Sequence, residues 1–187
     1  RFIGSRGGTS QWINPVRSGD MTVAASSPVS RFTDPEVVVS GDFANTSFAG
    51  PTFVPGVNGG GGGGGGGLDG GWWRVDLGEG RRLRCNYYSV RQDGSFYFPR
   101  QWELQGSVDG EREDGWMTLR KHVDDRTLCS PGQWAAWPVS APGSNVAVRF
   151  LRLKLTGPTT VAGDGVMASE GWRFCLCSFE FYGLLLT

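Results

Sequence analysis

The chain has 187 residues, with 18 basic and 18 acidic side chains and a single histidine. This length suits one domain with one buried core, and the balanced charge produces no overall field that would attract nucleic acid. No stretch reaches the roughly 18 apolar residues that a membrane-spanning helix requires. We therefore expect no nucleic-acid partner and no membrane span.

Residues 1–20 are punctuated by Gly, Pro, Ser and Asn and predict an extended lead-in, followed by a first strand over Met21 to Ala25. A helix start is predicted next, because Thr33 and Glu36 have capping-box spacing and proline is tolerated in a first turn. The valines that follow favour a strand. We therefore expect only one short helical turn there.

Nine consecutive glycines, Gly59 to Gly67, interrupt the chain. A glycine run cannot offset its backbone entropy by burying side chains, and no Gly-Lys-Ser/Thr follows that would indicate a phosphate-binding loop. We expect a disordered insertion at about 56–71 within a single domain spanning 1–187.

The segment after the glycine run holds three short strand-like stretches separated by turn residues. Trp73 to Leu77 alternates apolar and polar side chains, Cys85 to Arg91 is rich in Tyr and Val, and Trp102 to Gln105 alternates again. Three such stretches in so short a span, without helical periodicity between them, indicate antiparallel pairing.

The remaining stretches have the same character. Trp116 to Leu119 continues a hairpin, Gln133 to Val139 ends near a proline and suits an edge strand, and Phe150 to Thr156 separates leucines from charged residues by strict alternation. A last strand is predicted over Phe174 to Tyr182, ended by Gly183. The sequence predicts an all-β antiparallel sandwich.

Seven motifs stand in a recognisable order: WWRVDLG, CNYYSVRQDG, RQWELQGSVDG, LRKHVDD, PGQWAAWPV, RFLRLKLTGP and CSFEFYG. Together they resemble the discoidin domain family, also called coagulation factor V/VIII type C, and in particular the intracellular branch within HECT-type ubiquitin ligases and BTB-domain proteins. The resemblance implies a galactose-binding-like jelly roll of two sheets, whose loops at one end meet a partner.

The cysteines bear on where the domain works. Secreted members of this family commonly join the two ends of the domain by a disulfide, whereas here the first cysteine is Cys85. Cys175 and Cys177 would share one strand face and are badly placed to bridge each other. Buried free thiols favour a reducing compartment, so we expect an intracellular location.

The sequence offers little to catalysis or to metals. No G-x-S-x-G surrounds any serine, His122 is the only histidine, and the carboxylates fall in turns where Asp favours local backbone bonds. A zinc site would require all four cysteines and the histidine to converge, and no spaced series of carboxylates indicates Ca²⁺. We expect no enzyme activity and no cofactor.

Two loops are the candidate binding sites. The first contributes Arg91, Gln92, Asp93, Tyr97 and Arg100, a mixture of aromatic and charged groups that can stack on and hydrogen-bond a sugar or a peptide. The second contributes His122 and Asp124. In each loop the alternative is that the residues only build a turn or pack on the core.

We therefore hypothesise a non-catalytic recognition module of a larger intracellular protein, binding a protein or peptide, as in substrate recognition by a ubiquitin ligase. A carbohydrate-binding, lectin-like module is the alternative, and a structural piece of a large assembly is a third.

Overall fold

The computed structural model describes residues 11–26, 34–40, 71–160 and 170–187. The glycine-rich insertion expected at 56–71 lies outside these residues, apart from Gly71.

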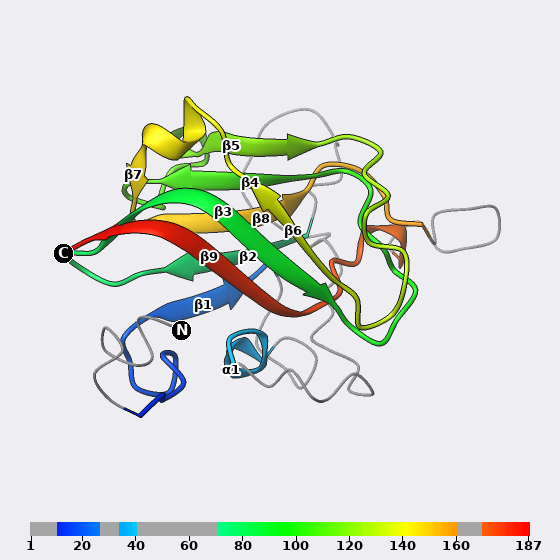
Figure 1. Ribbon diagram of the computed structural model, residues 1–187, viewed down its shortest axis with the longest axis horizontal. Helices are drawn as coiled ribbons and strands as arrows, with labels where there is room; N and C mark the ends of the chain where they lie inside the picture. Colours follow the sequence, from blue (N-terminus) through cyan, green and yellow to red (C-terminus); the bar gives the residue numbers. More distant parts are fainter. Residues whose placement is uncertain (1–10, 27–33, 41–70, 161–169) are drawn as a thin grey trace, which may run out of the picture.

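The described residues form a sandwich of two antiparallel sheets (Figure 1). The first sheet has the strand order β1 (Thr22–Ala25), β2 (Trp72–Asp76), β8 (Phe150–Leu155), β4 (Trp102–Ser107), β5 (Met117–His122). In the second sheet, β3 (Arg82–Gln92) is flanked on one side by β6 (Trp134–Pro138) and β7 (Ala147–Val148) and pairs along its length with β9 (Leu176–Leu186). The all-β antiparallel sandwich is confirmed.

Helical structure is confined to short turns in the described part of the chain. These are α1 (Pro35–Val38), η1 (Glu113–Gly115), η2 (Gly143–Asn145) and η3 (Glu170–Trp172). The single helical turn predicted near Pro35 is confirmed, but its cap is Asp34, whose side chain accepts a hydrogen bond from the Glu36 amide at 2.8 Å. Thr33, the expected cap, lies outside the described residues.

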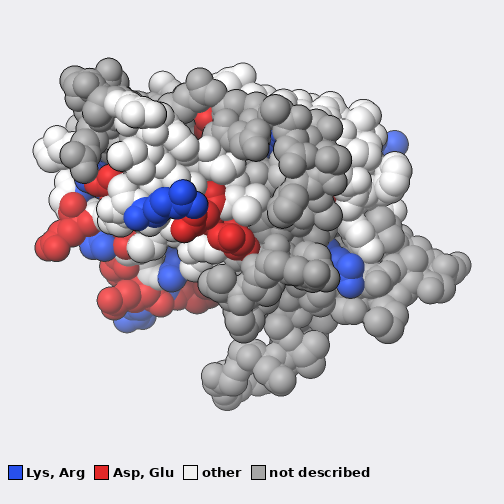
Figure 2. Space-filling model, turned by 90° about the horizontal axis from the view of Figure 1, so that it is seen from below, with Lys and Arg blue, Asp and Glu red and all other residues white. Residues whose placement is uncertain are grey.

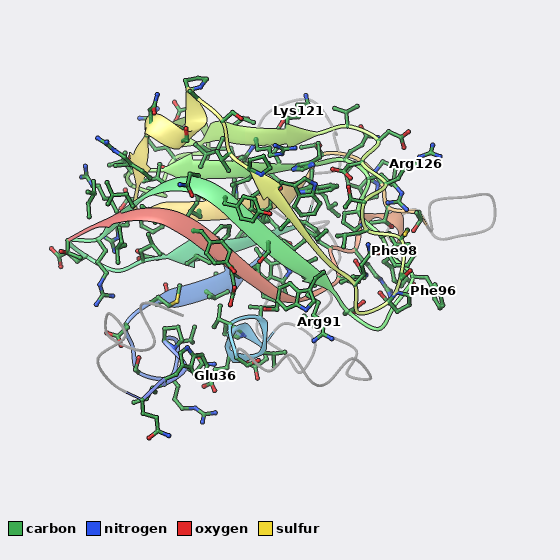
Figure 3. All side chains as sticks on the ribbon, in the orientation of Figure 1. Glu36, Arg91, Phe96, Phe98, Lys121 and Arg126 are labelled. Carbon is green, nitrogen blue, oxygen red and sulfur yellow. The ribbon has the colours of Figure 1, made fainter. Side chains whose placement is uncertain are left out.

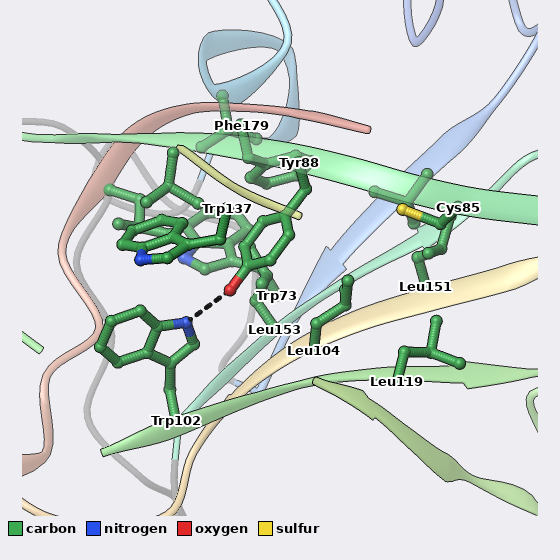
Figure 4. Close-up of a cluster of buried hydrophobic side chains, with 14 of the residues drawn as sticks. Trp73, Cys85, Tyr88, Trp102, Leu104, Leu119, Trp137, Leu151, Leu153 and Phe179 are labelled. Carbon is green, nitrogen blue, oxygen red and sulfur yellow. Dashed lines mark hydrogen bonds between the residues drawn. The ribbon is translucent and has the colours of Figure 1, made fainter. Parts of the chain in front are cut away.

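The core lies between the sheets and depends on alternating strand residues. Leu151, Leu153 and Leu155 of β8 point inward and are buried, while Arg152 and Lys154 point outward, as the sequence predicts. Large aromatic side chains fill the centre of the core (Figure 4): Trp73, Trp102 and Tyr88 are almost fully buried. Their burial supplies the main free energy that holds the two sheets together.

The last strand differs from its prediction. Gly183 does not end it, since β9 continues to Leu186. Gly183 adopts a φ of +152°, and a Cβ at this position would lie 1.9 Å from the carbonyl oxygen of Arg84. Glycine here therefore permits close pairing of β9 with β3 rather than a turn.

The two ends of the sandwich differ. The C-terminus lies at one end, and the loops that follow β3, β5 and β8 lie at the other (Figure 1).

On the face seen in Figure 2, acidic and basic side chains are interleaved toward one end rather than sorted by sign. This arrangement agrees with the net charge of zero.

Candidate functional site

The candidate site is the loop end of the sandwich, where the segment after β3 meets the segment after β5 (Figure 3). The two segments are joined through backbone groups: the Asp125 amide donates to the Arg100 carbonyl at 2.9 Å, and the Gly132 amide donates to the Asp93 carbonyl at 2.9 Å. Both loops therefore stand on one connected base.

Arg91 belongs to that base. It lies on the outer side of β3, is only 3% exposed, and its Nε donates to the Gly132 carbonyl at 3.0 Å. Its guanidinium lies 5.7 Å from the centre of the Trp134 ring, within cation–π range. The side chain thus fastens β3 to the turn that precedes β6.

Gln92 and Asp93 form a buried polar turn directly after Arg91. Asp93 Oδ1 accepts hydrogen bonds from the Ser95 amide at 2.8 Å and from Gln92 Nε2 at 3.2 Å. Burial raises the pKa of the Asp93 carboxyl, and the bonds from Ser95 and Gln92 act against that rise. Asp93 Oδ2 and Gln92 Oε1 have no hydrogen-bond partner among the described residues.

Arg100 holds the second loop by its backbone. Its Nη1 donates to the carbonyls of Asp125 at 3.0 Å and Leu128 at 2.7 Å. Because these two acceptors are in the loop after β5, Arg100 orders that loop against the segment that precedes β4.

The aromatic residues between Asp93 and Arg100 divide into two groups. Phe98 folds onto the core, and Tyr97 is half-buried with the Arg173 guanidinium 5.4 Å from its ring centre. Phe96, in contrast, is 67% exposed. Its backbone is fixed, since Thr160 Oγ1 donates to the Phe96 carbonyl at 2.7 Å and accepts from the Phe98 amide at 3.1 Å. Phe96 is thus an exposed aromatic side chain on a fixed backbone.

His122 ends β5 and lies in the core rather than in a loop. It is 3% exposed and stacks on Trp102, with ring centres 3.9 Å apart and planes within 5°. Burial lowers its pKa to about 4, although Asp125 acts to raise it. The ring is therefore neutral at physiological pH.

A chain of hydrogen bonds fixes how the neutral ring is protonated. Trp102 Nε1 donates to Tyr88 Oη at 3.1 Å, and the Tyr88 hydroxyl lies 2.5 Å from His122 Nε2. At the other side, His122 Nδ1 lies 2.7 Å from Asp125 Oδ2. A carboxylate only accepts, so Nδ1 carries the proton and Nε2 accepts from the tyrosine. This network positions the base of the second loop.

The tip of the second loop is exposed. Asp124 has a positive φ of 47° and pairs with Arg126, whose Nη2 lies 3.0 Å from Asp124 Oδ2. The neighbouring Val123 is 68% exposed. Of the seven candidate residues, the structure leaves Asp124 exposed, Tyr97 and Arg100 half-buried, and the other four buried.

The sequence did not single out Phe96, Val123 or Arg173. Phe96 and Phe98 are two residues apart in a stretch with no turn signal between them, so their pattern alone gave them the same environment. Arg173 enters the site from the segment before β9, and no local pattern indicates that proximity.

Among solved structures, the fold is similar to that of the CBM62 module of Clostridium thermocellum Xyl5A. The TM-score is 0.55 at 16% identity, over 89% of this chain and 96% of that one. A fucolectin from striped bass (Morone saxatilis) gives a TM-score of 0.57 at 15% identity, over 90% of this chain and 47% of that one. The fold is galactose-binding-like. The resemblance to discoidin domains is thus confirmed at the level of the fold.

This galactose-binding-like domain is 45% identical over 97% of its length to a BTB/POZ domain-containing protein of Arabidopsis thaliana. It is 27% identical over 97% of its length to the E3 ubiquitin-protein ligase Ufd4 of Drosophila melanogaster. It spans 20% and 6% of the lengths of these two relatives. The resemblance to the branch in ubiquitin ligases and BTB proteins is confirmed, whereas no protein-family profile matches the chain.

The described part of the chain has neither a cluster of metal ligands nor a membrane-spanning helix. It holds no cluster of three or more His, Cys, Asp or Glu side chains that could bind a metal ion. It also holds no helix long and apolar enough to cross a bilayer. All four cysteines are free thiols, and burial raises the pKa of Cys85 and of Cys177 to about 11.

Proposed function

We propose that this domain is a non-catalytic recognition module of a larger intracellular protein, and that it binds a protein or peptide segment through the loop end of the sandwich. The observation that carries the proposal is Phe96. A large aromatic side chain exposed to this extent on a backbone held by Thr160 loses little entropy when a partner covers it. Aromatic anchors of this kind dominate the binding energy of protein interfaces.

The second loop supplies the rest of the proposed surface. Val123 adds an exposed apolar side chain, while Asp124 and Arg126 form an exposed ion pair that a partner can exchange for its own charges. An apolar centre beside polar groups is the usual composition of a protein interface. The buried and half-buried residues below the loops support this surface by positioning them. These residues are Arg91, Gln92, Asp93, Arg100 and His122.

An intracellular role is supported by the relatives and by the cysteines. The relatives are named as a BTB protein and a ubiquitin ligase, and the four free thiols suit a reducing compartment. In a ligase, the module would hold a substrate while another part of the protein performs the chemistry.

The experiment is a selection of binders from a random peptide library displayed on phage, with the purified chain as bait. Binders are then measured against Phe96→Ser and Val123→Ser. We expect each substitution to weaken binding by about tenfold or more, whereas Met117→Ser, an exposed apolar residue on β5, should leave binding unchanged. Binders that are insensitive to both loop variants would place recognition elsewhere.

Arg100 is a poor probe of this surface because it also holds the loop. Loss of its bonds to the Asp125 and Leu128 carbonyls should lower the melting temperature of Arg100→Ala. A binding defect in that variant would therefore not distinguish contact from loop disorder.

A lectin-like function is the second candidate. The observation that favours it is Tyr97, which has the Arg173 guanidinium over one face of its ring, since an aromatic ring with a hydrogen-bond donor close to it suits a sugar. A glycan array probed with the chain and with Tyr97→Ala tests it. Glycan binding that is lost in Tyr97→Ala but kept in Phe96→Ser would replace the protein-binding proposal.

A further inference from the structure

A second exposed surface lies on the outer face of the β3–β9 pair. It consists of three pairs of residues that lie opposite each other on the two strands. Arg82 pairs with Leu186, Arg84 with Leu184, and Tyr87 with Tyr182. All six side chains are exposed, Leu184 by 57% and Tyr87 by 42%. We call these six residues the β3–β9 face.

A β-bulge brings them onto one face. Cys85 pairs with Gly183 and Tyr87 with Tyr182, so Asn86 has no residue opposite it on β9. Cys85 and Tyr88 are buried, while Asn86 and Tyr87 are both exposed. Strict alternation from Arg84 would have turned Tyr87 into the core, and the extra residue places it beside the arginines instead.

The six residues of this face include two arginines and no carboxylate, although Glu180, two residues before Tyr182 on β9, accepts a hydrogen bond from the Tyr182 hydroxyl. Neither Arg82 nor Arg84 makes an ion pair within the described part of the chain. The adjacent Arg81, in contrast, turns away from the face and bonds the Asp20 and Leu77 carbonyls. The basic cluster of the sequence therefore divides into one structural arginine and two that point to solvent.

We propose that the β3–β9 face docks an extended acidic segment of another protein. Arg82 and Arg84 are two residues apart on a strand, so their side chains stand roughly 7 Å apart, which matches alternate residues of an extended chain. Carboxylates at two alternate positions can each meet one arginine. An apolar residue at the next alternate position then meets the Tyr87–Tyr182 pair, whose rings are 6.1 Å apart.

Two alternatives to this occupant differ in what they require. An anionic membrane favours larger basic clusters and protruding apolar tips, whereas this face has two unpaired arginines on a sheet. A second copy of the chain would place its own Arg82 and Arg84 close to these arginines if it used the same face. The loop end lies at the opposite end of the sandwich from this face (Figure 1), so the two proposals are separable.

The test uses the full chain and a fluorescein-labelled peptide containing Glu-Ser-Glu-Ser-Phe, compared with Gln-Ser-Gln-Ser-Phe. Fluorescence anisotropy should show that the glutamate peptide binds about tenfold more tightly, and that added salt weakens it. The double variant Arg82→Glu with Arg84→Glu should weaken binding by about tenfold, a change of ~1.4 kcal/mol. The matched control is Arg112→Glu, because Arg112 is an exposed arginine in the loop before η1. This substitution should leave binding of the glutamate peptide unchanged.

Further readouts keep the proposal open to refutation. Phe96→Ser should bind the glutamate peptide normally, while Leu184→Ser should bind it less well. Amide NMR shifts should change at 82–87 and 182–186, which decides the matter even if the double variant does not fold.

Several results would overturn the proposal. They are equal binding of the two peptides, NMR shifts elsewhere, binding of phosphatidylserine vesicles in place of the peptide, or a dimer in sedimentation that Leu184→Ser dissociates.

Discussion

The outer faces of the two sheets both carry arginine on their strands, but the chain covers Arg152 on β8 and leaves Arg82 and Arg84 on β3 exposed. On β8, the Arg152 guanidinium donates to both carboxylate oxygens of Glu113 at 2.9 Å and lies 4.2 Å from the Trp116 ring centre. Lys154 reaches the same carboxylate at 3.0 Å. On β3, Arg82 and Arg84 stand beside exposed leucines instead.

The difference comes from a loop and not from the strands. Glu113 belongs to the polar segment between β4 and β5, which folds back over the first sheet and leaves the Arg152 side chain only 5% exposed. A charged strand residue is therefore part of the scaffold where a neighbouring loop neutralises it. Without such a loop, it remains available to a partner.

The largest effect is expected when the charge of the covered arginine, Arg152, is reversed and compared with the same change at the exposed Arg84. Arg152→Glu places a carboxylate beside Glu113 in a nearly buried position, and should lower the free energy of unfolding by about 3–5 kcal/mol. Arg84→Glu, the same change on the β3–β9 face, should alter it by less than about 0.5 kcal/mol. Urea denaturation measures both, and similar losses would remove the distinction between the faces.

A smaller loss is expected when the β3–β9 pairing itself is disturbed. Gly183→Ala should cost about 2–4 kcal/mol, because a methyl group would collide with the Arg84 carbonyl at a φ that other residues rarely adopt. Gly80→Ala is the control, since Gly80 also has a positive φ of 77° but open space around it. Its cost should be only about 1 kcal/mol, measured by thermal unfolding, and equal costs would show that the contact with β3 is unimportant.

Removing the charge of Glu113 should cost about 1–2 kcal/mol, since Arg152 then loses its carboxylate while Glu113 itself is largely exposed. Asp114→Asn is the matched control, because Asp114 pairs only with the exposed Arg112 and should contribute almost nothing. Calorimetry of Glu113→Gln and Asp114→Asn compares the two. A stable Glu113→Gln would mean that the loop does not hold the first face.

The smallest effect is a pH dependence of the same contact. The hydrogen bond with Arg152 lowers the pKa of Glu113 from its usual 4.5 to about 2. A carboxyl whose pKa is lower in the folded state stabilises the fold above the unfolded pKa and loses that contribution as the pH falls through the folded one. The stability gap between wild type and Glu113→Gln should therefore narrow between about pH 4.5 and pH 2. Denaturation at several pH values checks this, and a constant gap would contradict it.

The sequence predicted those parts of the fold that depend on local alternation. The leucines of β8 alternate with charged residues over the whole strand, and a period of two fixes which face is buried. The same argument fails for β3, because the bulge at Asn86 shifts the alternation of inward and outward side chains by one residue partway along the strand. The sequence near Asn86 does not indicate the bulge, because the extra residue is recognised only by the lack of a residue opposite it on β9.

Prediction of the candidate site was limited by contacts that are distant in sequence. The order of the motifs identified the two loops, but the backbone that leaves Phe96 exposed and Phe98 buried is held by Thr160, which is 64 and 62 residues away from them. His122 lies in a polar sequence, and its burial depends on Trp102 and Tyr88. Burial of a polar residue is favourable where its partners are already in place, and this cannot be judged from neighbouring residues alone.

The bulge at Asn86 also has a consequence for comparing this chain with its relatives. Before Asn86, the inward-facing residues of β3 have odd numbers, as Leu83 and Cys85 do. After Asn86, they have even numbers, as Tyr88 and Val90 do. A relative that lacks the extra residue must be aligned with a one-residue gap at this position. Without that gap, every core residue on one side of it would be matched to a surface residue, and the identity of the strand would be underestimated.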